Sequence, residues 1–260
     1  GDLDISGIVF TLGPRINAAG RVANARGSVE LLIAQSETEA NQLAEKINLK
    51  NDVRREFDLS ITEEAVAMIE ESETLMKSKS TVLFKETWHK GIIGIVAARC
   101  VEKFYKPTVI LTESNDKLTG SARSIKGFDL YKAIDQCADL LEKYGGHKYA
   151  AGLTLDKKNL EAFKERFEKI AAATLTDEEM IPIVEIDIPI QFDLMTSKFN
   201  NVLKQMAPFG PENLRPVFEA RNVFVMNSLS SFKDRHLRFV IGQAGTKVVF
   251  NAVAFDLMEY

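Results

Sequence analysis

Four short segments of this chain combine glycines with hydroxyl or basic side chains, a mixture that suits a bound phosphate group. The run GGHKYAAG at 145–152 places two glycines beside His147 and Lys148. Glycines accept positive φ angles, and consecutive N–H groups in such a turn form a concave anion site. We expect a helix over 129–144, with Gly145 as its C′ residue. On this run alone, an ordinary helix end is the simpler interpretation.

Two further segments contain arginine beside small or hydroxyl residues. Ser121 and Arg123 are two residues apart, so they share a face if this segment is a strand. A hydroxyl beside a guanidinium can cradle a phosphate, which arginine binds bidentately. Arg15 and Arg21 flank a loop of small residues, which also suits a phosphate. For both segments, a solvated surface arginine is the simpler local interpretation.

The fourth segment holds the only tryptophan, Trp88, next to His89 and just before an expected helix over 92–105. A helix N-terminus attracts anions, because its first N–H groups and the helix dipole present positive charge. A buried Trp–His pair that packs the start of the helix is an equally good interpretation.

No segment predicts the machinery that would cleave a phosphate. A metal centre needs clustered Asp, His, Glu or Cys side chains, but His89, His147 and His236 are far apart and the chain has only two cysteines. P-loop, dinucleotide-binding and nucleophile-elbow motifs are absent as well. We therefore expect a surface that binds phosphates, with no catalytic residue and no metal ligand in this chain.

The composition is that of a globular protein. Of 260 residues, 45% are hydrophobic and 27% are charged, which excludes a disordered, collagen-like or disulfide-stapled chain. Charged residues interrupt every apolar run before it reaches the roughly 18 residues that a membrane span needs, and the first residues lack the pattern of a signal peptide. Cys100 and Cys137 are interpreted as buried thiols in a reducing compartment. We expect a cytoplasmic protein without a membrane segment.

The net charge of −4 is unevenly distributed along the chain. Residues 28–76 carry a net −8, residues 77–158 a net +6 and residues 177–260 a net −3. A basic region inside an acidic protein suits an anionic partner, although ordinary scatter also produces differences of this size. We place most of the expected nucleic-acid affinity in the basic middle region.

The periodicity of apolar residues predicts α/β architecture after a long helix. A capping box, in which Ser36 caps the helix and Glu39 reaches back, begins a helix over 37–72 that would span roughly 50 Å and suits a connector between domains. A mixed sheet with packed helices is expected next. Its strands are predicted at 81–84, 108–112, 118–124 and 150–155, and its helices at 92–105, 129–144 and 157–174.

A small antiparallel β-domain is expected after about residue 177. Its strands are predicted at 183–192, 217–229, 237–241 and 247–255, and a short helix at 196–206. A closed five-stranded barrel needs at least one more strand than these long runs supply. We therefore expect an OB-like domain that is truncated.

Taken together and in this order, these segments resemble the C-terminal part of the RecJ family, single-strand-specific DNA exonucleases of the DHH phosphoesterase superfamily. The matching segments are PRINAAGR at 14–21, WHKGIIGIVA at 88–97, SARS at 121–124, GFDL at 127–130, GGHKYAAG at 145–152, PFGPEN at 208–213 and HLR at 236–238. The resemblance implies four parts. They are the end of a catalytic DHH domain at 1–30, a connector helix at 31–76, a DHH-associated substrate-binding domain at 77–176 and an OB-like domain at 177–260.

The resemblance also implies roles for particular residues. Ser121 and Arg123 match positions that hold the 5′-phosphate of the DNA, and Arg21 matches a third such position. The motif that grips the nucleic-acid backbone near the scissile phosphate is matched by Gly145, Gly146 and His147. These six residues form the predicted nucleic-acid-binding site.

The resemblance implies an intact enzyme that degrades single-stranded DNA from its 5′ end in DNA repair and recombination. Two Mn²⁺ or Mg²⁺ ions, held by a DHH domain upstream of this chain, would activate water and stabilise the developing charge. We expect no metal on this chain and no nuclease activity of the chain alone. Its expected partners are single-stranded DNA with a 5′-phosphate, single-strand-binding protein and a helicase.

Two other interpretations stay open. A phosphodiesterase of the same superfamily would act on oligoribonucleotides or cyclic dinucleotides, but such a small substrate needs no strand-guiding β-domain. A non-enzymatic module that recruits repair proteins would bind proteins without any dependence on a DNA 5′ end.

Overall fold

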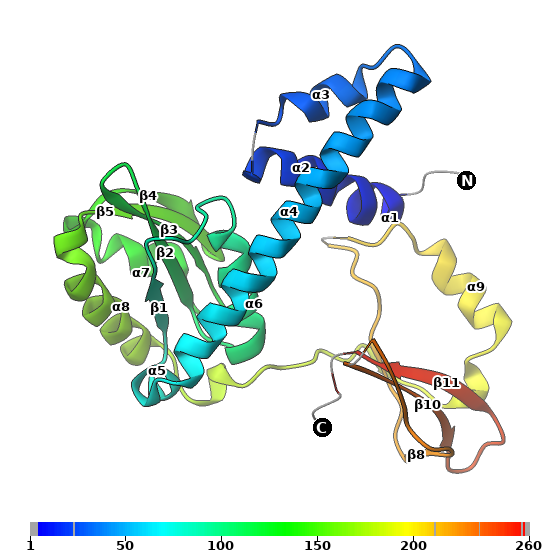
Figure 1. Ribbon diagram of the computed structural model, residues 1–260. Coiled ribbons are helices and arrows are strands. Elements are labelled where there is room, and N and C mark those ends of the chain that lie inside the picture. The colour runs from blue at the N-terminus through cyan, green and yellow to red at the C-terminus, as the bar shows by residue number, and fades with distance from the viewer. Residues whose placement is uncertain (1–4, 23, 211, 234, 256, 258–260) are drawn as a thin grey trace. The chain divides into compact units, whose positions relative to one another are not determined.

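A computed structural model describes residues 5–22, 24–210, 212–233, 235–255 and 257 of the chain (Figure 1). The chain divides into two compact units, Gly1–Pro182 and Ile183–Tyr260. The first unit contains a group of N-terminal helices and an α/β layer. The described part of the second unit contains a small antiparallel sheet, a separate pair of short strands and helix α9 (Ser197–Gln205).

The N-terminal part of the first unit consists of helices, two of which pack on one long helix. The elements of this part are α1 (Ile5–Gly7), a π-helical turn (Ile8–Leu12), α2 (Gly13–Val22), α3 (Arg26–Leu32) and α4 (Glu37–Glu70). The prediction of a loop around 13–21 is wrong, because these residues form α2. Its small residues Ala18 and Ala19 are buried, and α2 packs against α4. Small side chains let two helices approach closely, and that tertiary contact outweighs the glycines in the segment.

The predicted long helix is confirmed, and it begins at the predicted cap. The Ser36 hydroxyl accepts the Glu39 N–H at 3.3 Å. The Glu39 carboxylate accepts the N–H of Gln35 at 3.2 Å, one residue earlier than the capping box predicts. Two N–H groups at the helix start are satisfied in this way, and α4 runs for 34 residues.

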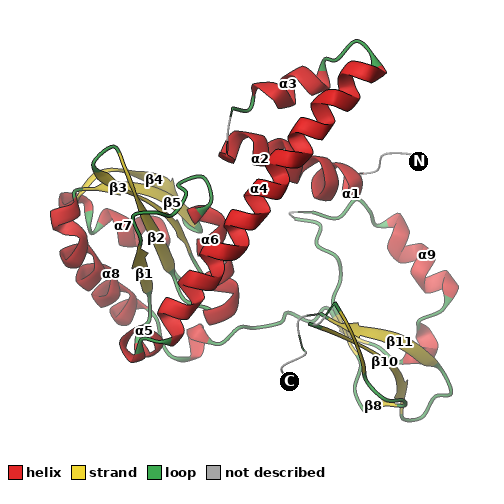
Figure 2. Ribbon diagram, viewed as in Figure 1, coloured by secondary structure: helices red, strands yellow, loops and turns green. Residues whose placement is uncertain are grey.

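A mixed sheet forms the centre of the α/β layer, as predicted, but it has five strands where the sequence predicted four (Figure 2). Its strands are β1 (Thr81–Phe84), β2 (Thr108–Ser114), β3 (Lys117–Arg123), β4 (Leu141–His147) and β5 (Ala150–Leu155), in the order β1-β2-β3-β5-β4. Only the β1–β2 pair is parallel among these neighbours. The remaining elements of this layer are α5 (Glu73–Lys77), α6 (Ile93–Phe104), α7 (Leu130–Asp135), α8 (Leu160–Thr174) and single 3₁₀ turns at Ala138–Leu140, Lys157–Asn159 and Glu178–Met180.

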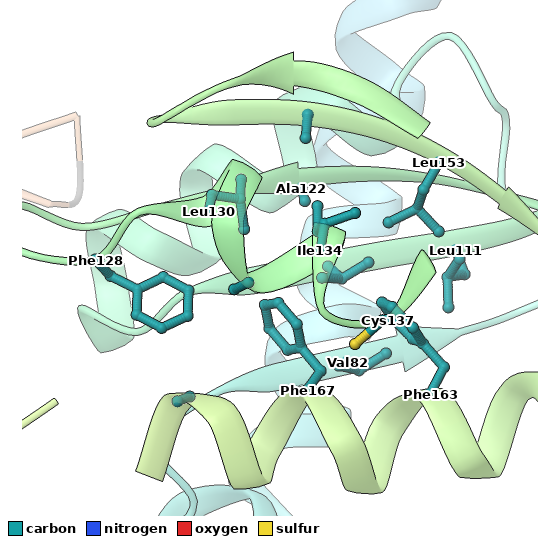
Figure 3. Packing of buried hydrophobic residues seen from close by; sticks show 14 of the residues in the cluster. Val82, Leu111, Ala122, Phe128, Leu130, Ile134, Cys137, Leu153, Phe163 and Phe167 are labelled. Atoms are coloured by element: carbon teal, nitrogen blue, oxygen red, sulfur yellow. The ribbon is translucent and has the colours of Figure 1, made fainter. Parts of the chain in front are cut away.

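Helices cover both faces of the sheet. On one face, α7 and α8 enclose a cluster in which the rings of Phe163 and Phe167 stack at 5.7 Å and Phe128 meets Phe167 edge-on at 6.1 Å (Figure 3). On the other face, α4 and α6 enclose a second cluster that includes Trp88. Burial on both faces explains why β2 reads as a continuous apolar run rather than an alternating one.

The predicted helix over 129–144 is only partly correct. Asp129 caps α7 as expected, since its carboxylate accepts the Lys132 N–H at 3.2 Å, but α7 ends at Asp135. Residues 141–147 form β4, which pairs with β5. Gly145 is therefore a strand residue, and its prediction as a helix C′ residue is wrong. The backbone hydrogen bonds that β5 offers decide this segment, which local propensity did not reveal.

The second unit is built on an antiparallel sheet, as predicted. Its elements are β6 (Ile188–Pro189), a 3₁₀ turn (Phe192–Leu194), α9 (Ser197–Gln205), β7 (Phe218–Glu219), β8 (Val223–Val225), β9 (Ser230–Phe232), β10 (His236–Gln243) and β11 (Val249–Ala254). Strand β10 is central and pairs with β8, β9 and β11. Strands β6 and β7 form a separate parallel pair.

The predictions of continuous strands at 183–192 and 217–229 are wrong. The first shortens to β6, where Pro189 has no N–H to donate to a ladder. The second is divided into β7 and β8 by Asn222, whose φ of 55° interrupts the extended backbone. In the loop at 208–213, Gly210 and Asn213 exchange two backbone hydrogen bonds, while Pro211 lies outside the described residues.

Candidate nucleic-acid interface

The N-terminus of α6 meets the C-terminal end of α2. Arg21 Nη1 donates to the Gly91 carbonyl at 3.2 Å. A Cβ atom at Gly91 would lie 2.1 Å from the Arg21 carbonyl oxygen, so only glycine allows the two segments to approach this closely. This contact brings Arg21 to the positive end of α6, although 70 residues separate Arg21 from Gly91.

Ser121 and Arg123 lie beside the first turn of α6. A Cβ atom at Gly94 would lie 2.9 Å from Ser121 Oγ and 3.1 Å from Arg123 Nη2. Arg123 Nη1 donates to Ser121 Oγ at 3.2 Å and to the Ala122 carbonyl at 2.8 Å. The predicted common face is confirmed, and it points toward the helix N-terminus.

The electrostatics of this junction favour an anion. Burial lowers the pKa of Arg123, and the nearby Arg21 lowers that pKa further. Among the described residues, neither guanidinium has a carboxylate within ion-pair distance. Arginine stays charged in proteins, so two cations remain without a counter-ion at a helix N-terminus. A phosphate would relieve their mutual repulsion and accept their N–H groups.

The β4–β5 hairpin extends this junction with a floor that has few side chains. In register, Ser121 lies opposite Gly152, which lies opposite Gly145. Residues directly opposite each other in antiparallel strands share a face of the sheet. Gly145 and Gly152 are exposed, so they form a bare strip of backbone next to Ser121.

A second row of the same face ends in His147. Arg123 lies opposite Ala150, which lies opposite His147. The His147 Nδ1 atom accepts the Tyr149 N–H at 3.3 Å, so the neutral ring carries its proton on Nε2. The exposed ring therefore presents a donor at the edge of the strip.

Gly146 is required by the backbone conformation of the hairpin, and its position belongs to the other face of the sheet. Its register partner is Ala151, which is buried in the core with Ala122. Its φ is 151°, and a Cβ atom there would lie 2.3 Å from the Ala150 carbonyl oxygen. The position therefore requires glycine for backbone reasons, and Gly146 can offer a ligand only its backbone.

Two hydrogen bonds fix the tip of the hairpin. The Tyr149 carbonyl accepts the Ser124 N–H at 3.1 Å, and the Lys148 carbonyl accepts the Leu130 N–H at 3.0 Å. The tip is thereby tied to the end of β3 and to the start of α7. The glycine strip is held at a set position relative to Arg123.

A buried ion cluster that the sequence analysis missed locks α6 onto α4. Asp58 has a side chain only 3% exposed, and it accepts from Arg99 Nε at 2.7 Å and from Arg99 Nη2 at 2.8 Å. Arg54 Nη1 also donates to Asp58 at 3.4 Å. The hydrogen bond to Asp58 raises the pKa of Arg99, whereas burial lowers that of Arg54. The only signal in the sequence is an acidic residue one helical turn before Ile61 in an otherwise apolar stripe.

Other candidate residues have structural roles. Trp88 is buried and its Nε1 donates to Glu64 at 2.7 Å, which agrees with the packing interpretation of the Trp–His pair. Arg15 donates to Asn48 at 2.8 Å and to the Thr11 carbonyl at 2.6 Å, away from the contacts of Arg21. His236 belongs to the second unit, where it packs between Phe232 and Phe255.

The described residues do not fit a metal centre. No three His, Cys, Asp or Glu side chains in this part of the chain lie close enough together to hold a metal ion. The buried carboxylate of Asp58 is already paired with arginines. Within the residues described, no helix is both long and apolar enough to cross a bilayer.

Comparison with known proteins identifies two domains. Residues 77–173 match the model of the DHHA1 domain, and residues 186–260 match that of the RecJ OB domain. The single-stranded-DNA-specific exonuclease RecJ of Bacillus subtilis (strain 168) is 35% identical over 218 residues, which are 83% of this chain and 28% of that protein. The enzyme of the same name from Salmonella typhimurium is 31% identical over 264 residues, 98% of this chain and 45% of that protein.

A solved structure agrees with these matches. The crystal structure of RecJ in complex with Mn²⁺ from Thermus thermophilus superposes with a TM-score of 0.79 at 26% identity, over 96% of this chain and 36% of that chain. The chain thus spans less than half the length of the curated relatives reported above. The two domain models match residues 77–173 and 186–260, the fold agrees over 96% of the chain, and the chain belongs to the RecJ family, as the part that carries the DHHA1 and OB domains.

Proposed function

We propose that this chain is the substrate-binding portion of a RecJ-like exonuclease that degrades single-stranded DNA from the 5′ end in DNA repair and recombination. One observation carries the proposal. Arg21, Ser121 and Arg123 converge at the N-terminus of α6, with two guanidinium groups that have no carboxylate partner among the described residues. Such a site suits a terminal phosphate, which carries more charge than a phosphate within the strand.

The strip beside this site gives the strand a direction. A 5′-phosphate at Arg123 leaves the following backbone free to run across Gly152 and Gly145, where no side chain stands in the way. His147 Nε2 would then donate to a phosphate oxygen further along. In this proposal, Gly145 and His147 contact the nucleic-acid backbone from the open face of the hairpin. Gly146 instead allows the hairpin backbone to adopt its conformation.

The division of the chain into parts at 1–30, 31–76, 77–176 and 177–260 remains a prediction. The domain matches at 77–173 and 186–260 support its last two parts. In this scheme α4 is the connector helix, and the second unit is the OB-like domain. We assign it a guiding role for the strand, because its net charge of −3 over 177–260 does not favour strong binding of DNA by itself.

In this proposal the chain binds the DNA strand and orients it. Hydrolysis of the strand requires metal-binding residues that the described part of the chain does not bring together. Solved RecJ proteins carry Mg²⁺ or Mn²⁺, and we propose that the intact enzyme uses such an ion. Since the described residues offer no matching donor set, we expect the purified chain to leave DNA uncut in the presence of Mn²⁺. Single-strand-binding protein and a helicase remain predicted partners.

The test is fluorescence anisotropy of the chain with short single-stranded DNA that ends in a 5′-phosphate or a 5′-hydroxyl. We expect the phosphorylated end to bind about ten- to hundredfold more tightly, as for a charged group with several hydrogen bonds. Arg123→Ala should remove this preference. Arg166→Ala is the matched control, because it removes another arginine of the same unit. Arg166 lies on α8 and pairs with Asp139, on the opposite face of the sheet from Arg123.

Two results would change the proposal. Equal binding of both ends with a steep salt dependence would leave only a generic basic surface. Binding of oligoribonucleotides in preference to DNA would favour the superfamily phosphodiesterase instead.

A further inference from the structure

A hollow of about 570 Å³ lies beside Arg21 in the first unit. The end of α2, Phe57 of α4, the loop at 87–90 and Glu113 of β2 line it. Its volume is in the range of small-molecule sites. Of the six predicted site residues, only Arg21 lines this hollow. The proposed function assigns no role to the hollow itself.

The wall of the hollow is aromatic. The rings of Phe57 and His89 stack with a centroid distance of 5.4 Å and an interplanar angle of 27°. Phe57 is 41% exposed, so part of its ring stays open to solvent although His89 stacks on it. A flat, partly exposed ring beside a cationic site is the arrangement that proteins use to stack nucleobases.

Three hydrogen bonds hold the loop that carries His89, and Phe57, its stacking partner, lies on helix α4. His89 Nδ1 accepts the Gly91 N–H at 3.1 Å. Trp88 is tied to Glu64 of α4, and its carbonyl accepts the Thr112 hydroxyl at 2.6 Å. The aromatic wall is therefore formed before any ligand arrives, which lowers the entropic cost of binding.

Polar groups at the rim of the hollow, from His89 and Arg21, could bind the polar atoms of a nucleotide. Because Nδ1 of His89 is an acceptor, Nε2 carries the proton of the neutral ring, and no described residue accepts it. Arg21 lines the hollow and also lies near Arg123, whose pKa it lowers. The anion site and the aromatic wall thus share one residue.

We propose that this hollow receives the base of the 5′-terminal nucleotide, stacked on Phe57, while Arg21, Ser121 and Arg123 hold its 5′-phosphate. The inference rests on the proposed function, because it places the base next to the phosphate site assigned there. Stacking accepts any base, so the site would measure the presence of a base and not its identity. The chain would then distinguish an intact 5′ nucleotide from one that has lost its base.

The experiment compares two 5′-phosphorylated oligonucleotides that differ only in whether the first nucleotide is abasic. Binding to the 260-residue chain is measured by anisotropy, beside the same pair with 5′-hydroxyl ends. We expect the abasic end to bind roughly five- to hundredfold more weakly, the range for one base–aromatic stack. A 2-aminopurine at the first position should also lose fluorescence on binding, and the same base at the last position should not.

Variants of the wall separate stacking from a structural role. Phe57→Leu should bind intact and abasic ends equally, whereas Phe57→Tyr should keep the wild-type difference because it keeps a ring. Phe10→Leu makes the same change at a residue that is 78% exposed and outside the hollow, and it should have no effect. If Phe57→Leu lowers the affinity for both ends alike, the ring only supports the loop, and the inference is wrong.

The outcomes also distinguish this inference from the proposed function. A wild-type chain that prefers 5′-phosphate but binds abasic and intact ends equally would overturn the inference and leave the proposed function standing. A chain with no 5′-phosphate preference would overturn the proposed function, and the inference would fall with it.

Discussion

The two units of this protein use similar strand sequences but bury them to different degrees. In the first unit, helices lie on both faces of the sheet, and Phe163, Phe167 and Leu155 have no exposed surface. In the described part of the second unit, Ile190 and Phe192 are the only hydrophobic side chains in the buried class, while Phe224 is 51% exposed. The comparison teaches that alternation in the sequence predicts a strand, but the elements packed on it decide how much stability the strand contributes.

The difference matters for function because the candidate site lies on the well-buried unit. Its residues come from α2, α6, β3 and the β4–β5 hairpin, and each of these is held by core packing or by hydrogen bonds of its backbone. A phosphate site needs such a frame, since its arginines must stay close together against their repulsion.

The largest effect expected from this comparison is on core phenylalanines. Phe167→Ala should lower the free energy of unfolding of the first unit by about 3–5 kcal/mol, because it empties a fully buried site. Phe224→Ala should cost the second unit about 1 kcal/mol or less, since half of this ring already meets water. Denaturant unfolding measures both, and the single tryptophan, Trp88, reports on the first unit alone. Equal losses of unfolding free energy in the two variants would contradict the difference in burial between the two units.

An intermediate effect is expected within the hairpin. Gly146→Ala should destabilise the first unit by about 1–3 kcal/mol, because a side chain is strained at this φ and would overlap the Ala150 carbonyl. Gly145→Ala should change stability by about 0.5 kcal/mol or less, since no atom lies within 4 Å of the added Cβ.

The same pair of variants also sharpens the proposed function. Gly145→Ala should weaken the binding of single-stranded DNA although the protein stays folded, because its methyl group stands on the bare strip. Tryptophan fluorescence follows unfolding, and anisotropy follows binding. Equal stability of the two variants would show that the hairpin tip is not part of the rigid frame.

A pH-dependent effect of similar size to that in the hairpin concerns the two thiols, which both lie in the first unit. Burial raises the pKa of Cys100 and of Cys137 from 9.0 to about 11. The folded unit therefore keeps these protons when the unfolded chain has lost them, so their contribution is complete below pH 9 and is lost as the pH rises toward 11. At pH 10 the loss should be about 1.4 kcal/mol per thiol.

This loss can be measured as the slope of unfolding free energy against pH between about 8 and 10, with Trp88 as the probe. Replacing both cysteines by alanine should flatten the slope, whatever the variant's stability at the lower pH. The second unit has no cysteine, so its transition should lack this component. An unchanged slope in the variant would contradict the assignment.

Much of the fold could be predicted from local sequence. The long helix was predicted from the cap at Ser36 and the absence of glycine and proline after it, and strand β2 from its run of β-branched residues. The strands at β1, β3 and β5 were predicted from the alternation of short apolar segments with helices. The errors occurred where tertiary contacts outweigh local preference. Residues 141–147 pair with β5 instead of continuing a helix, and the small residues of α2 form a helix because α4 packs against them.

The candidate site, like the fold, was predicted where local sequence decides and missed where tertiary contacts decide. Ser121 and Arg123 could be placed on one face from their spacing, and the glycines at 145 and 146 were recognised by type. Their distinct roles could not be separated, because Gly145 and Gly146 differ only in which side of the hairpin they face. The Asp58 cluster and the hollow beside Phe57 were missed, since their residues lie far apart in the chain.

The sequence by itself determined which residue types are available: arginines and a serine that suit a phosphate, and glycines that allow close approach. Periodicity and capping, which act over a few residues, determined most helices and strands as well. Only the tertiary structure decided that Arg21 reaches the Gly91 carbonyl and comes close enough to Arg123 to affect its charge. The physical reason is that helix packing and strand register act between distant segments, and a bound anion responds to the charges that those contacts bring together.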